Sequence, residues 1–566
     1  MVSIPLSADR DDVETSSFPD KENQESVGQS RSAAGSGIAG AAILIMAGNL
    51  LSRILGLVRE QLASGLFGTG DKIAAFQIAD NVHTLLFDLI ISGMLQAALV
   101  PVLIQWAAPD AFNLGELRRV SGALMTMVLT FVGGAVALGI IFAPSVVRVM
   151  TSLGGGDKER SPETTALTIE LVRIILPAVF FLAIGTLLMS QLYALNQVTA
   201  PALSLAARNL IVVIVMVLFS GTWGVKSMAI GVVAGAAAIA VMNAVPLYRQ
   251  GALPKPNIGF NHPGVHQVLK LYFPIFLGLI VSTLAVIVDR NLAWRAEEDA
   301  LGAMRYATTL VQFLLGMVAA AISLAALPTL SAHFTRGDES AFRHTLERAL
   351  IMATILIVPA VLGLAALSRP IVDLLFRHGE TNSDDAHLIV IALLGYLPGT
   401  LFAAYDQILI YSFYARKNTW WPVLVGLAAT LVYFAVAIPM GRNYGMIGLV
   451  IANSAQFVAH ALIMFVLARK TLGGDGWRPL GLVIARCTAA SLLMAGTVFG
   501  IWSTLERALP TGGSTLLRTG YELIAAGLPA LIGAIIYALL LHRFRVGEAT
   551  ELRNAVLGKI SPRLAR

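Results

Sequence analysis

The sequence predicts an all-α polytopic membrane protein with about 14 transmembrane helices, and three observations support this fold class. The 566-residue chain is 56% hydrophobic and only 13% charged, whereas a typical soluble domain is about 25% charged. Its mean hydropathy is +0.75. Its apolar residues lie in blocks of about 20 residues, the length that a helix needs to cross a bilayer. A transmembrane β-barrel would instead show short alternating segments, so we expect helices.

The predicted spans follow a polar segment at the start of the chain. Residues 1–36 are Ser-rich and mixed in charge, without a periodic apolar pattern, which is typical of a disordered tail. They lack the basic region and apolar core of a signal peptide, so we expect no cleavage. Fourteen apolar stretches follow, at approximately 38–58, 74–104, 120–146, 166–195, 201–221, 224–246, 267–293, 303–330, 347–367, 386–413, 421–440, 444–468, 480–503 and 521–542.

Basic residues predict how the chain is oriented in the membrane. An even number of spans places both termini on one side, together with the strongly basic residues 544–566. Because Lys and Arg concentrate in cytoplasmic loops, we expect both termini in the cytoplasm. The net charge of +6 then reflects contact with anionic lipid, and we expect no nucleic-acid partner. Three basic pairs lie on the same predicted side: Arg118 and Arg119, Arg416 and Lys417, and Arg469 and Lys470.

Proline recurs inside the predicted spans. Proline removes a backbone hydrogen bond and bends a helix, which a membrane interior tolerates only where neighbours or cavity water satisfy the freed carbonyl. Irregular packing explains any single proline equally well, but six bent helices fit a transporter better than a rigid scaffold. The six are Pro101, Pro177, Pro274, Pro328, Pro359 and Pro398.

The second stretch carries a polar stripe. Asp80, Thr84, Asp88, Ser92 and Gln96 follow one another at four-residue spacing and share one helix face. A charge in a membrane is costly and normally faces an internal cavity or a partner. We therefore expect this face, with Asp88 near the middle of the span, to line a cavity. A buried structural ion pair is the alternative for Asp88.

Two arginines end the first stretch and are candidates for anion binding. Arg53 and Arg59 are six residues apart, which places them about 120° apart around a helix and about 9 Å apart along it. Both side chains can therefore line one wide cavity without touching. Arginine stays charged and grips phosphate oxygens in a bidentate manner. The alternative is that the side chains reach out to the membrane interface.

Further ionisable residues lie in the later stretches. Asp289 and Arg290 are adjacent, hence about 100° apart on a helix, so we expect them not to pair with each other. Each then needs a partner on another helix or cavity water, and Asp88 is one candidate partner for Arg290. For Arg305 and Asp406, a structural or interfacial role is as consistent with the sequence as substrate contact.

Sequence signatures of soluble-enzyme chemistry are absent. The chain has no GxxxxGK[ST] loop for ATP, no HExxH and no GxSxG, and its single cysteine, Cys487, excludes an intramolecular disulfide. We therefore expect a transporter rather than an enzyme. We also expect no metal site and no cofactor, with Na⁺ or H⁺ as the coupling cation.

Several segments together resemble a known family. SRILGLVREQLASGLFG, followed by SGMLQAALVPVL, resembles the opening of the MurJ/MviN family, the lipid-linked peptidoglycan precursor flippases of the MATE-like (MOP) exporter superfamily. PAVLGLAALSRPIVDLLFRHGE and ILIYSFYARKNTWWP are the most distinctive of the later matching segments. The resemblance extends from Gly37 to about His542, which is nearly the whole chain.

The resemblance implies an architecture and a location. It implies alternating access by two six-helix lobes around a central cavity, in a bacterial cytoplasmic (inner) membrane. The N-terminal lobe would comprise residues 37–246 and the C-terminal lobe residues 247–470. Two further helices over 471–543 would close the fold before the basic tail at 544–566.

The resemblance also implies site residues. Arg53 and Arg59 match arginines that line the family's cavity. Asp289 and Arg290 would restore cavity charge that is lost where this chain departs from the family pattern. Those departures are Ala74, Phe87, Asp88 and Ser92 in the second helix, and Thr309 and Gln312 in the eighth.

We therefore expect a flippase that moves lipid II, a polyprenyl-pyrophosphate-linked peptidoglycan precursor, to the outer leaflet. An ion gradient or the membrane potential would drive it. Membrane lipids and cell-wall synthesis proteins are the further expected partners. The expected substrate-binding residues are Arg53, Arg59, Arg290, Asp88 and Gln312, and the expected coupling or cavity residues are Asp80, Asp88, Asp289 and Asp406.

Three alternatives stay open at this point. The substrate could be another polyprenyl-linked oligosaccharide, handled by the same arginines. A cation-coupled exporter of small amphipathic molecules would favour acids and aromatics over arginines in its pocket. A scaffold that recruits cell-wall enzymes would lose function when its tails are truncated and keep it when cavity residues are changed.

Overall fold

The computed structural model describes residues 44, 46–91, 99, 102, 103, 105, 114–152, 161–296, 299–472, 477–508 and 515–547. Within these ranges the chain is helical and contains no strand, which confirms the all-α prediction. The predicted tail at 1–36 and the end of the basic tail, 548–566, lie outside the described residues, as do Ser92, Gln96 and Pro101.

The first half of the chain begins with a helix over residues 46–67. A π-helical segment, η2, joins α4 to α5 without a break. Pro177 separates α7 from α8, as expected of a residue that cannot donate a backbone hydrogen bond. The further elements are α2 (Asp71–Ile91), α4 (Leu114–Met127), η2 (Val128–Val132), α5 (Gly133–Ile141), α6 (Ala143–Ser152), α7 (Pro162–Ile175), α8 (Pro177–Ala194), α9 (Thr199–Trp223) and α10 (Lys226–Arg249).

The second half contains longer helices. Helix α16 is interrupted at Gly445, whose φ of 53° and ψ of −128° are not helical. Its 53 residues would span about 80 Å as one helix, so its two parts correspond to the eleventh and twelfth predicted spans. The elements are α11 (Pro263–Trp294), α12 (Ala300–Thr335), α13 (Glu339–Ala366), α14 (Ser368–Phe376), α15 (Ser383–Ala415), α16 (Trp420–Leu472), α17 (Arg478–Ala508) and α18 (Thr515–Arg543).

The described helices are long and apolar enough for a polytopic membrane protein. Ten of them can cross a membrane by length and composition, with α16 counted once. The helix over 46–67, α2 and α11 lie where the sequence predicts the first, second and seventh spans. The first helix continues to residue 67, beyond the predicted end of the first apolar stretch at residue 58. The charges of Arg59 and Glu60, at which the apolar stretch seemed to end, are paired inside the protein.

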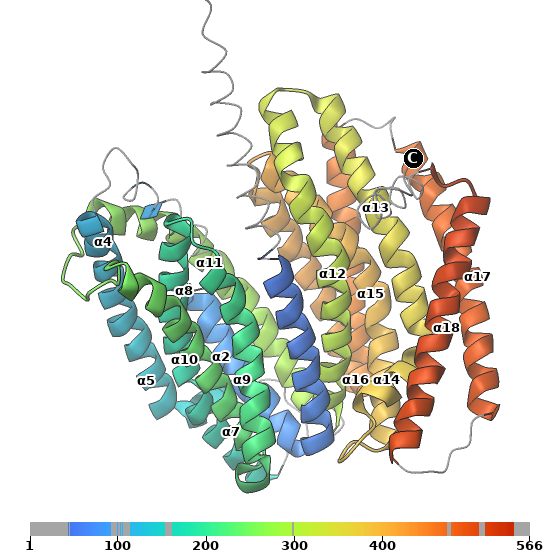
Figure 1. Ribbon diagram of the computed structural model, residues 1–566, viewed down its shortest axis with the longest axis horizontal. Helices are drawn as coiled ribbons and strands as arrows, with labels where there is room; N and C mark the ends of the chain where they lie inside the picture. The colour runs from blue at the N-terminus through green and yellow to red at the C-terminus, as the bar shows by residue number, and fades with distance from the viewer. Residues whose placement is uncertain are drawn as a thin grey trace, which may run out of the picture.

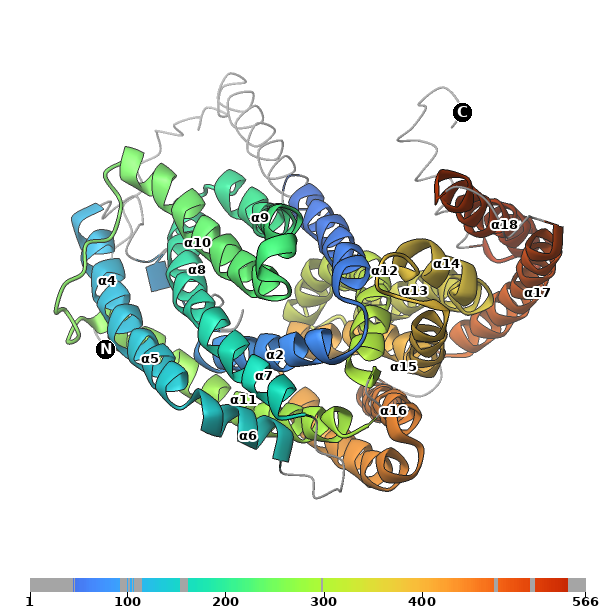
Figure 2. The same cartoon turned by 90° about the horizontal axis from the view of Figure 1, so that it is seen from below.

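Two groups of helices meet along a seam (Figures 1 and 2). One group contains α4 to α10, and the other contains α12 to α18. The helix over 46–67 lies between them, next to α9 on one side and α12 on the other. Helix α11 contacts α2, α4 and α6 and also α12 and α16, so it connects the two groups. Helices α17 and α18 pack on α13 and α14 at the outer edge.

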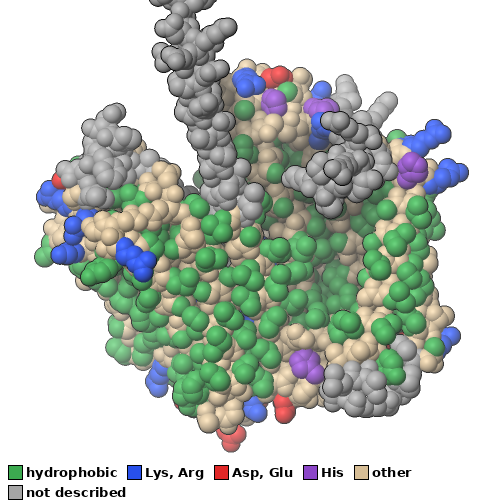
Figure 3. Space-filling model, in the orientation of Figure 1, with side chains coloured by type: hydrophobic (Ala, Val, Ile, Leu, Met, Phe, Trp, Pro, Cys, Tyr) green, Lys and Arg blue, Asp and Glu red, His purple; other side chains and the backbone are tan. Residues whose placement is uncertain are grey.

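The outer surface matches a lipid environment. In Figure 3, hydrophobic side chains cover the middle of the visible face, while Lys, Arg, Asp, Glu and His gather toward its two ends. Phe131, Leu218 and Leu431 are among the large apolar side chains that point outward. A soluble protein would not expose such a continuous apolar face.

Polar end groups explain where several helices begin. Ser161 accepts a hydrogen bond from the Thr164 amide before Pro162 opens α7. Asn382 and Asp385 form a reciprocal capping box at the start of α15. These residues satisfy backbone amides that have no partner within the helix. The charge of Asp385 in the sequence RHGETNSDD therefore helps to begin a helix.

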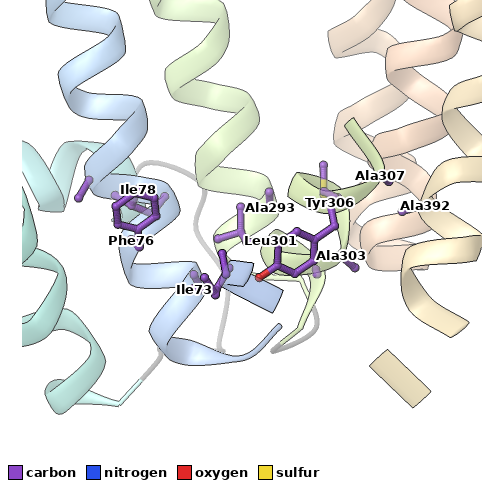
Figure 4. Close-up of a cluster of buried hydrophobic side chains, with 14 of the residues drawn as sticks. Ile73, Phe76, Ile78, Ala293, Leu301, Ala303, Tyr306, Ala307 and Ala392 are labelled. Atoms are coloured by element: carbon purple, nitrogen blue, oxygen red, sulfur yellow. The ribbon is translucent and has the colours of Figure 1, made fainter. Parts of the chain in front are cut away.

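The hydrophobic core continues across the seam. Figure 4 shows Ile73 and Phe76 of α2 in the same cluster as Leu301 and Tyr306 of α12, with Ala392 of α15 behind them. All five side chains are fully buried. The two groups of helices are therefore packed tightly where α2 and α12 begin, and this packing encloses the charged residues described next.

Candidate functional site

Four ionisable residues from three helices form a continuous set of ion pairs, which we call the charge network, and His83 Nδ1 lies 3.2 Å from Asp80 Oδ1 at its edge. Glu60 accepts two hydrogen bonds from Arg305, at 2.7 Å from Nε and 2.8 Å from Nη2. The same carboxylate accepts from Arg59, at 3.0 Å from Nε and 2.6 Å from Nη2. Arg305 also donates from Nη1 to Asp80 at 2.9 Å. The network therefore joins the helix over 46–67 to α2 and α12.

The centre of the network is buried. Glu60 is 1% exposed and Arg305 is 7% exposed. Burying an isolated charge is very costly, so these groups are stable there only because each is paired and hydrogen-bonded. Arg305 also donates to Gln77 and lies over the Phe76 ring at 5.0 Å. The guanidinium is thus held from several sides.

Helix α9 fixes the outer part of the network. Arg59 donates from Nη1 to the Asn209 side chain at 3.4 Å. Asn209 in turn donates from Nδ2 to the Ser52 carbonyl at 2.9 Å. Arg59 therefore does not reach out to the membrane interface, and that alternative is wrong.

Arg53 lies further along the same helix and has no carboxylate partner among the described residues. Its Nη1 donates to the backbone carbonyl of Gln312 at 3.0 Å. The guanidinium lies over Gly316, where an added Cβ would overlap it. Arg53 and Gln312, which the sequence proposes separately as substrate-binding residues, are thus brought together, and both are exposed.

The helix over 46–67, α2 and α12 each have a buried part and an exposed part. Glu60, residues 73–79 and Arg305 are buried, whereas Arg53, Thr84 and Gln312 are exposed. On each helix the exposed residue is separated along the chain from the buried part. The two groups of helices are therefore packed together at one end of the seam and present an accessible polar face toward the other.

Hydrogen bonds close the packed end of the seam. Tyr306 donates its hydroxyl to the Gly68 carbonyl at 2.9 Å. Thr69 donates to Asp299 at 2.9 Å and to Asp385 at 2.6 Å. Gly302 has no side chain at the point where the Thr69 backbone passes, and an added Cβ would overlap it. Close backbone approach and hydrogen bonding hold this end together.

The segment after α14 adds a second set of contacts at the same end. The Glu380 amide donates to the Gly65 carbonyl at 2.9 Å, and Thr381 donates its hydroxyl to the Ser64 carbonyl at 2.8 Å. Gly379 has a φ of 62° and lies directly against Gly65. Glycine adopts this left-handed conformation without a steric penalty. The segment RHGET therefore contacts the first helix from the other half of the chain.

Asp289 and Arg290 correct two expectations. Arg290 Nε lies 3.5 Å from Asp289 Oδ2, so the adjacent residues do pair. The long arginine side chain folds back over the helix surface, which the angle between the two backbone positions does not reveal. The expected pair between Arg290 and Asp88 is not formed, and Asp88 is half-buried on α2. Asp289 has the expected partner on another helix, because Tyr433 of α16 donates its hydroxyl to it.

Asp406 belongs to a separate ion pair. Its Oδ1 lies 2.6 Å from His460 Nδ1, and the pair joins α15 to α16. Asp406 is 5% exposed. The residue is therefore in the interior of the second helix group.

Two residues of this region were not identified from the sequence. Glu60 follows Arg59 directly, and a lone carboxylate next to an arginine in an apolar stretch was the available signal. Arg208 lies in the middle of the fifth stretch, LSLAARNLIV, where any ionisable residue is a functional candidate. Among the described residues, no group of three or more His, Cys, Asp or Glu could hold a metal ion.

Comparison with known proteins gives a family match. A family model described as lipid II flippase MurJ matches residues 63–517 of the chain. A protein from Vibrio cholerae named probable lipid II flippase MurJ is 27% identical over 511 residues, covering 87% of this chain and 95% of the relative. Lipid II flippase MurJ from Burkholderia cenocepacia is 25% identical, covering 86% of this chain and 95% of the relative.

Solved structures show the same fold. A structure of lipid II flippase MurJ in an inward closed conformation aligns with a TM-score of 0.71 at 23% identity, covering 89% of this chain and 98% of that chain. An inward-facing multidrug resistance MATE family transporter of the MOP superfamily aligns with a TM-score of 0.63 at 15% identity, covering 76% of this chain and 98% of that chain.

Proposed function

This chain belongs to the lipid II flippase MurJ family, and from that premise we propose that it moves lipid II from the cytoplasmic to the outer leaflet of the bacterial inner membrane. The family is one of transporters and not of enzymes, so the function consists of binding and moving an intact lipid. Both termini would lie in the cytoplasm, as the sequence predicts.

The proposal rests on the accessible polar face, which includes Arg53, Thr84 and Gln312. Lipid II has a pyrophosphate between its polyprenyl tail and its sugars, and an arginine without a carboxylate partner suits such an anion. Arg53 is exposed on this face, and the charge network lies further inside. The pyrophosphate and sugars would enter from the accessible end while the polyprenyl tail stays in lipid.

Transport would proceed by alternating access. The packed end of the seam would have to open, and the accessible end would have to close. The hydrogen bonds of Tyr306, Thr69 and Thr381 at the packed end would break in that step. The prolines inside α12, α13 and α15 are positions where these helices can bend.

An ion gradient or the membrane potential would supply the energy. The potential contributes about 2.3 kcal/mol per charge for each 100 mV. Asp88, Asp289 and Asp406 are the carboxylates through which Na⁺ or H⁺ would be coupled to the lobe movement. Asp80 is bound to Arg305 in the charge network, so its role would be to hold the network and not to carry an ion.

A second candidate is cation-coupled export of small molecules. The alignment with a MATE family transporter favours it, since the same fold serves that class. The arginines of the polar face argue against it, because a cationic drug would be repelled there. Another polyprenyl-linked oligosaccharide would use the same arginines as lipid II, and recruitment of cell-wall synthesis proteins would be an additional role.

The test is a complementation experiment. The native lipid II flippase is depleted from a tractable bacterium, which then expresses the wild-type chain, Arg53→Ala or the control Arg249→Gln. Arg249 is exposed at the end of α10 and has no ion pair among the described residues. We expect lipid II to reach the outer leaflet with the wild type and the control and to be lost with Arg53→Ala.

The other outcomes decide between the candidates. Wild-type activity in Arg53→Ala would remove Arg53 from the site. If neither the wild type nor the control exposes lipid II although both are folded in the membrane, the lipid II proposal is wrong. Export assays with other lipid-linked glycans and with cationic dyes would then separate the two alternatives.

A further inference from the structure

The charge network is electrically balanced, which limits what it can bind. Its two arginines, Arg59 and Arg305, face two carboxylates, Glu60 and Asp80. The Nε and Nη2 donors of both arginines point to Glu60, and their Nη1 donors are bound to Asn209 in one case and to Gln77 and Asp80 in the other. The Nε–Nη2 edge of each arginine, which could hold an anion in a bidentate manner, is therefore already occupied by Glu60.

Arg208 on α9 is charged, close to the network and unpaired. No hydrogen bond or ion pair of its guanidinium occurs among the residues that the structure describes, and its Nε is buried without a partner. The next residue on α9, Asn209, bonds to Arg59 of the network. A buried donor without a partner is unfavourable, so this position gains when an acceptor arrives.

The backbone around Arg208 is held by contacts with two neighbouring helices. The next residue, Asn209, bonds to Arg59 and to Ser52 on the first helix. On the α10 side, Gly235 lies against the Arg208 carbonyl and Cγ, where an added Cβ would be 2.7 Å and 3.1 Å away. The backbone of α9 is thus fixed on both sides, and only the end of the side chain is free to move.

We propose that Arg208 is a substrate-binding residue that takes a diphosphate oxygen of the lipid, and this rests on the proposed function. It adds an uncompensated positive charge to a network that cancels its own charges. Arg53 supplies a second such charge on the first helix. The network then positions α2, α9 and α12 around the anion, while these two arginines attract it.

The experiment measures lipid binding to the purified full chain in nanodiscs. The variants are Arg208→Gln, which removes the charge, Arg208→Lys, which keeps it, and the control Arg249→Gln. The probes are undecaprenyl pyrophosphate, the uncharged undecaprenol, and inorganic pyrophosphate as a soluble competitor. Thermal unfolding of each variant reports on folding.

We expect Arg208→Gln to weaken undecaprenyl pyrophosphate binding about tenfold or more, since a hydrogen bond to a charged group contributes about 1.5–3 kcal/mol. Arg208→Lys should retain most of the affinity, and undecaprenol binding should not change. If inorganic pyrophosphate competes only at concentrations far above those of the lipid, the anion is recognised as part of a lipid. Equally effective competition would assign the site to a free diphosphate.

Two results would overturn the proposal. Unchanged affinity in a folded Arg208→Gln would show that the residue does not contact the lipid. Lowered thermal stability with unchanged affinity would make it a structural partner of Asp80. Failure of the proposed function is distinguishable, because a wild-type chain that binds undecaprenyl pyrophosphate but never exposes lipid II refutes the transport assignment and leaves that of Arg208 intact.

Discussion

The charge network and the Asp406–His460 pair are both buried, but they differ in composition and reach. The network connects the first helix, α2 and α12 across the seam, whereas the pair joins α15 and α16 within one group of helices. The network's cations are arginines, which stay protonated at any physiological pH. Histidine changes charge near neutral pH. The network is therefore suited to fixed positioning, and the pair is suited to responding to protons.

Removing Glu60 tests the network most severely. Glu60→Gln leaves Arg59 and Arg305 without their shared carboxylate, and breaking a buried ion pair costs about 3–5 kcal/mol. We expect lower thermal stability of the purified protein and complete loss of lipid II exposure at the outer leaflet. The double variant Glu60→Gln/Arg305→Met removes the unpaired buried charge as well.

The double variant separates folding from function. Replacing both partners of a buried pair is often close to neutral for stability, but Arg59 and Asp80 each lose a partner as well. The unfolding temperature should therefore recover only in part while transport stays absent. Recovery of transport together with stability would show that the network only holds the helices together. It would then differ from the Asp406–His460 pair in location alone.

Asp406→Asn tests the Asp406–His460 pair. The amide can still accept a hydrogen bond from His460, so we expect a stability loss of about 1–2 kcal/mol. Binding of undecaprenyl pyrophosphate should be unchanged, while transport into proteoliposomes should lose its dependence on an imposed pH gradient. A variant that keeps this dependence would make the pair purely structural, and weakened lipid binding would place it at the substrate.

Gly316→Ala tests the role of Arg53 without changing any charge. The added methyl occupies the space of the Arg53 guanidinium and breaks its bond to the Gln312 carbonyl. Losing that bond costs on the order of 1 kcal/mol, or about fivefold in lipid affinity. Alanine favours the helix, so stability should not fall. Wild-type affinity would mean that Arg53 can bind from several positions.

Tyr433→Phe should have the smallest effect. It removes the hydrogen bond to Asp289 and leaves Arg290 as the neighbour of that carboxylate. We expect a loss of about 1 kcal/mol in unfolding free energy and a small change in transport rate, measured in the same proteoliposomes. A large transport defect in a stable Tyr433→Phe would assign Asp289 a more direct part in coupling than Asp406.

Much of the candidate site could be predicted, but its pairing could not. Arg53 and Asp80 were identified because a charge in an apolar stretch is visible locally, and Gln312 was identified through the resemblance to the family. Asp88 was one candidate partner for Arg290, but Arg290 pairs with Asp289, because side-chain direction and reach decide that contact. Glu60 was missed because its neighbour Arg59 made the segment read as the end of a span, although the two charges offset each other inside the protein.

The sequence by itself determined the helical membrane fold, because transfer of apolar residues from water to lipid sums along each local stretch of the chain. The tertiary structure alone decided which charges meet. Arg305 is separated from Glu60 by 245 residues and from Asp80 by 225 residues, and no local pattern links them. The cost of an unpaired buried charge selects that arrangement only once the helices have packed.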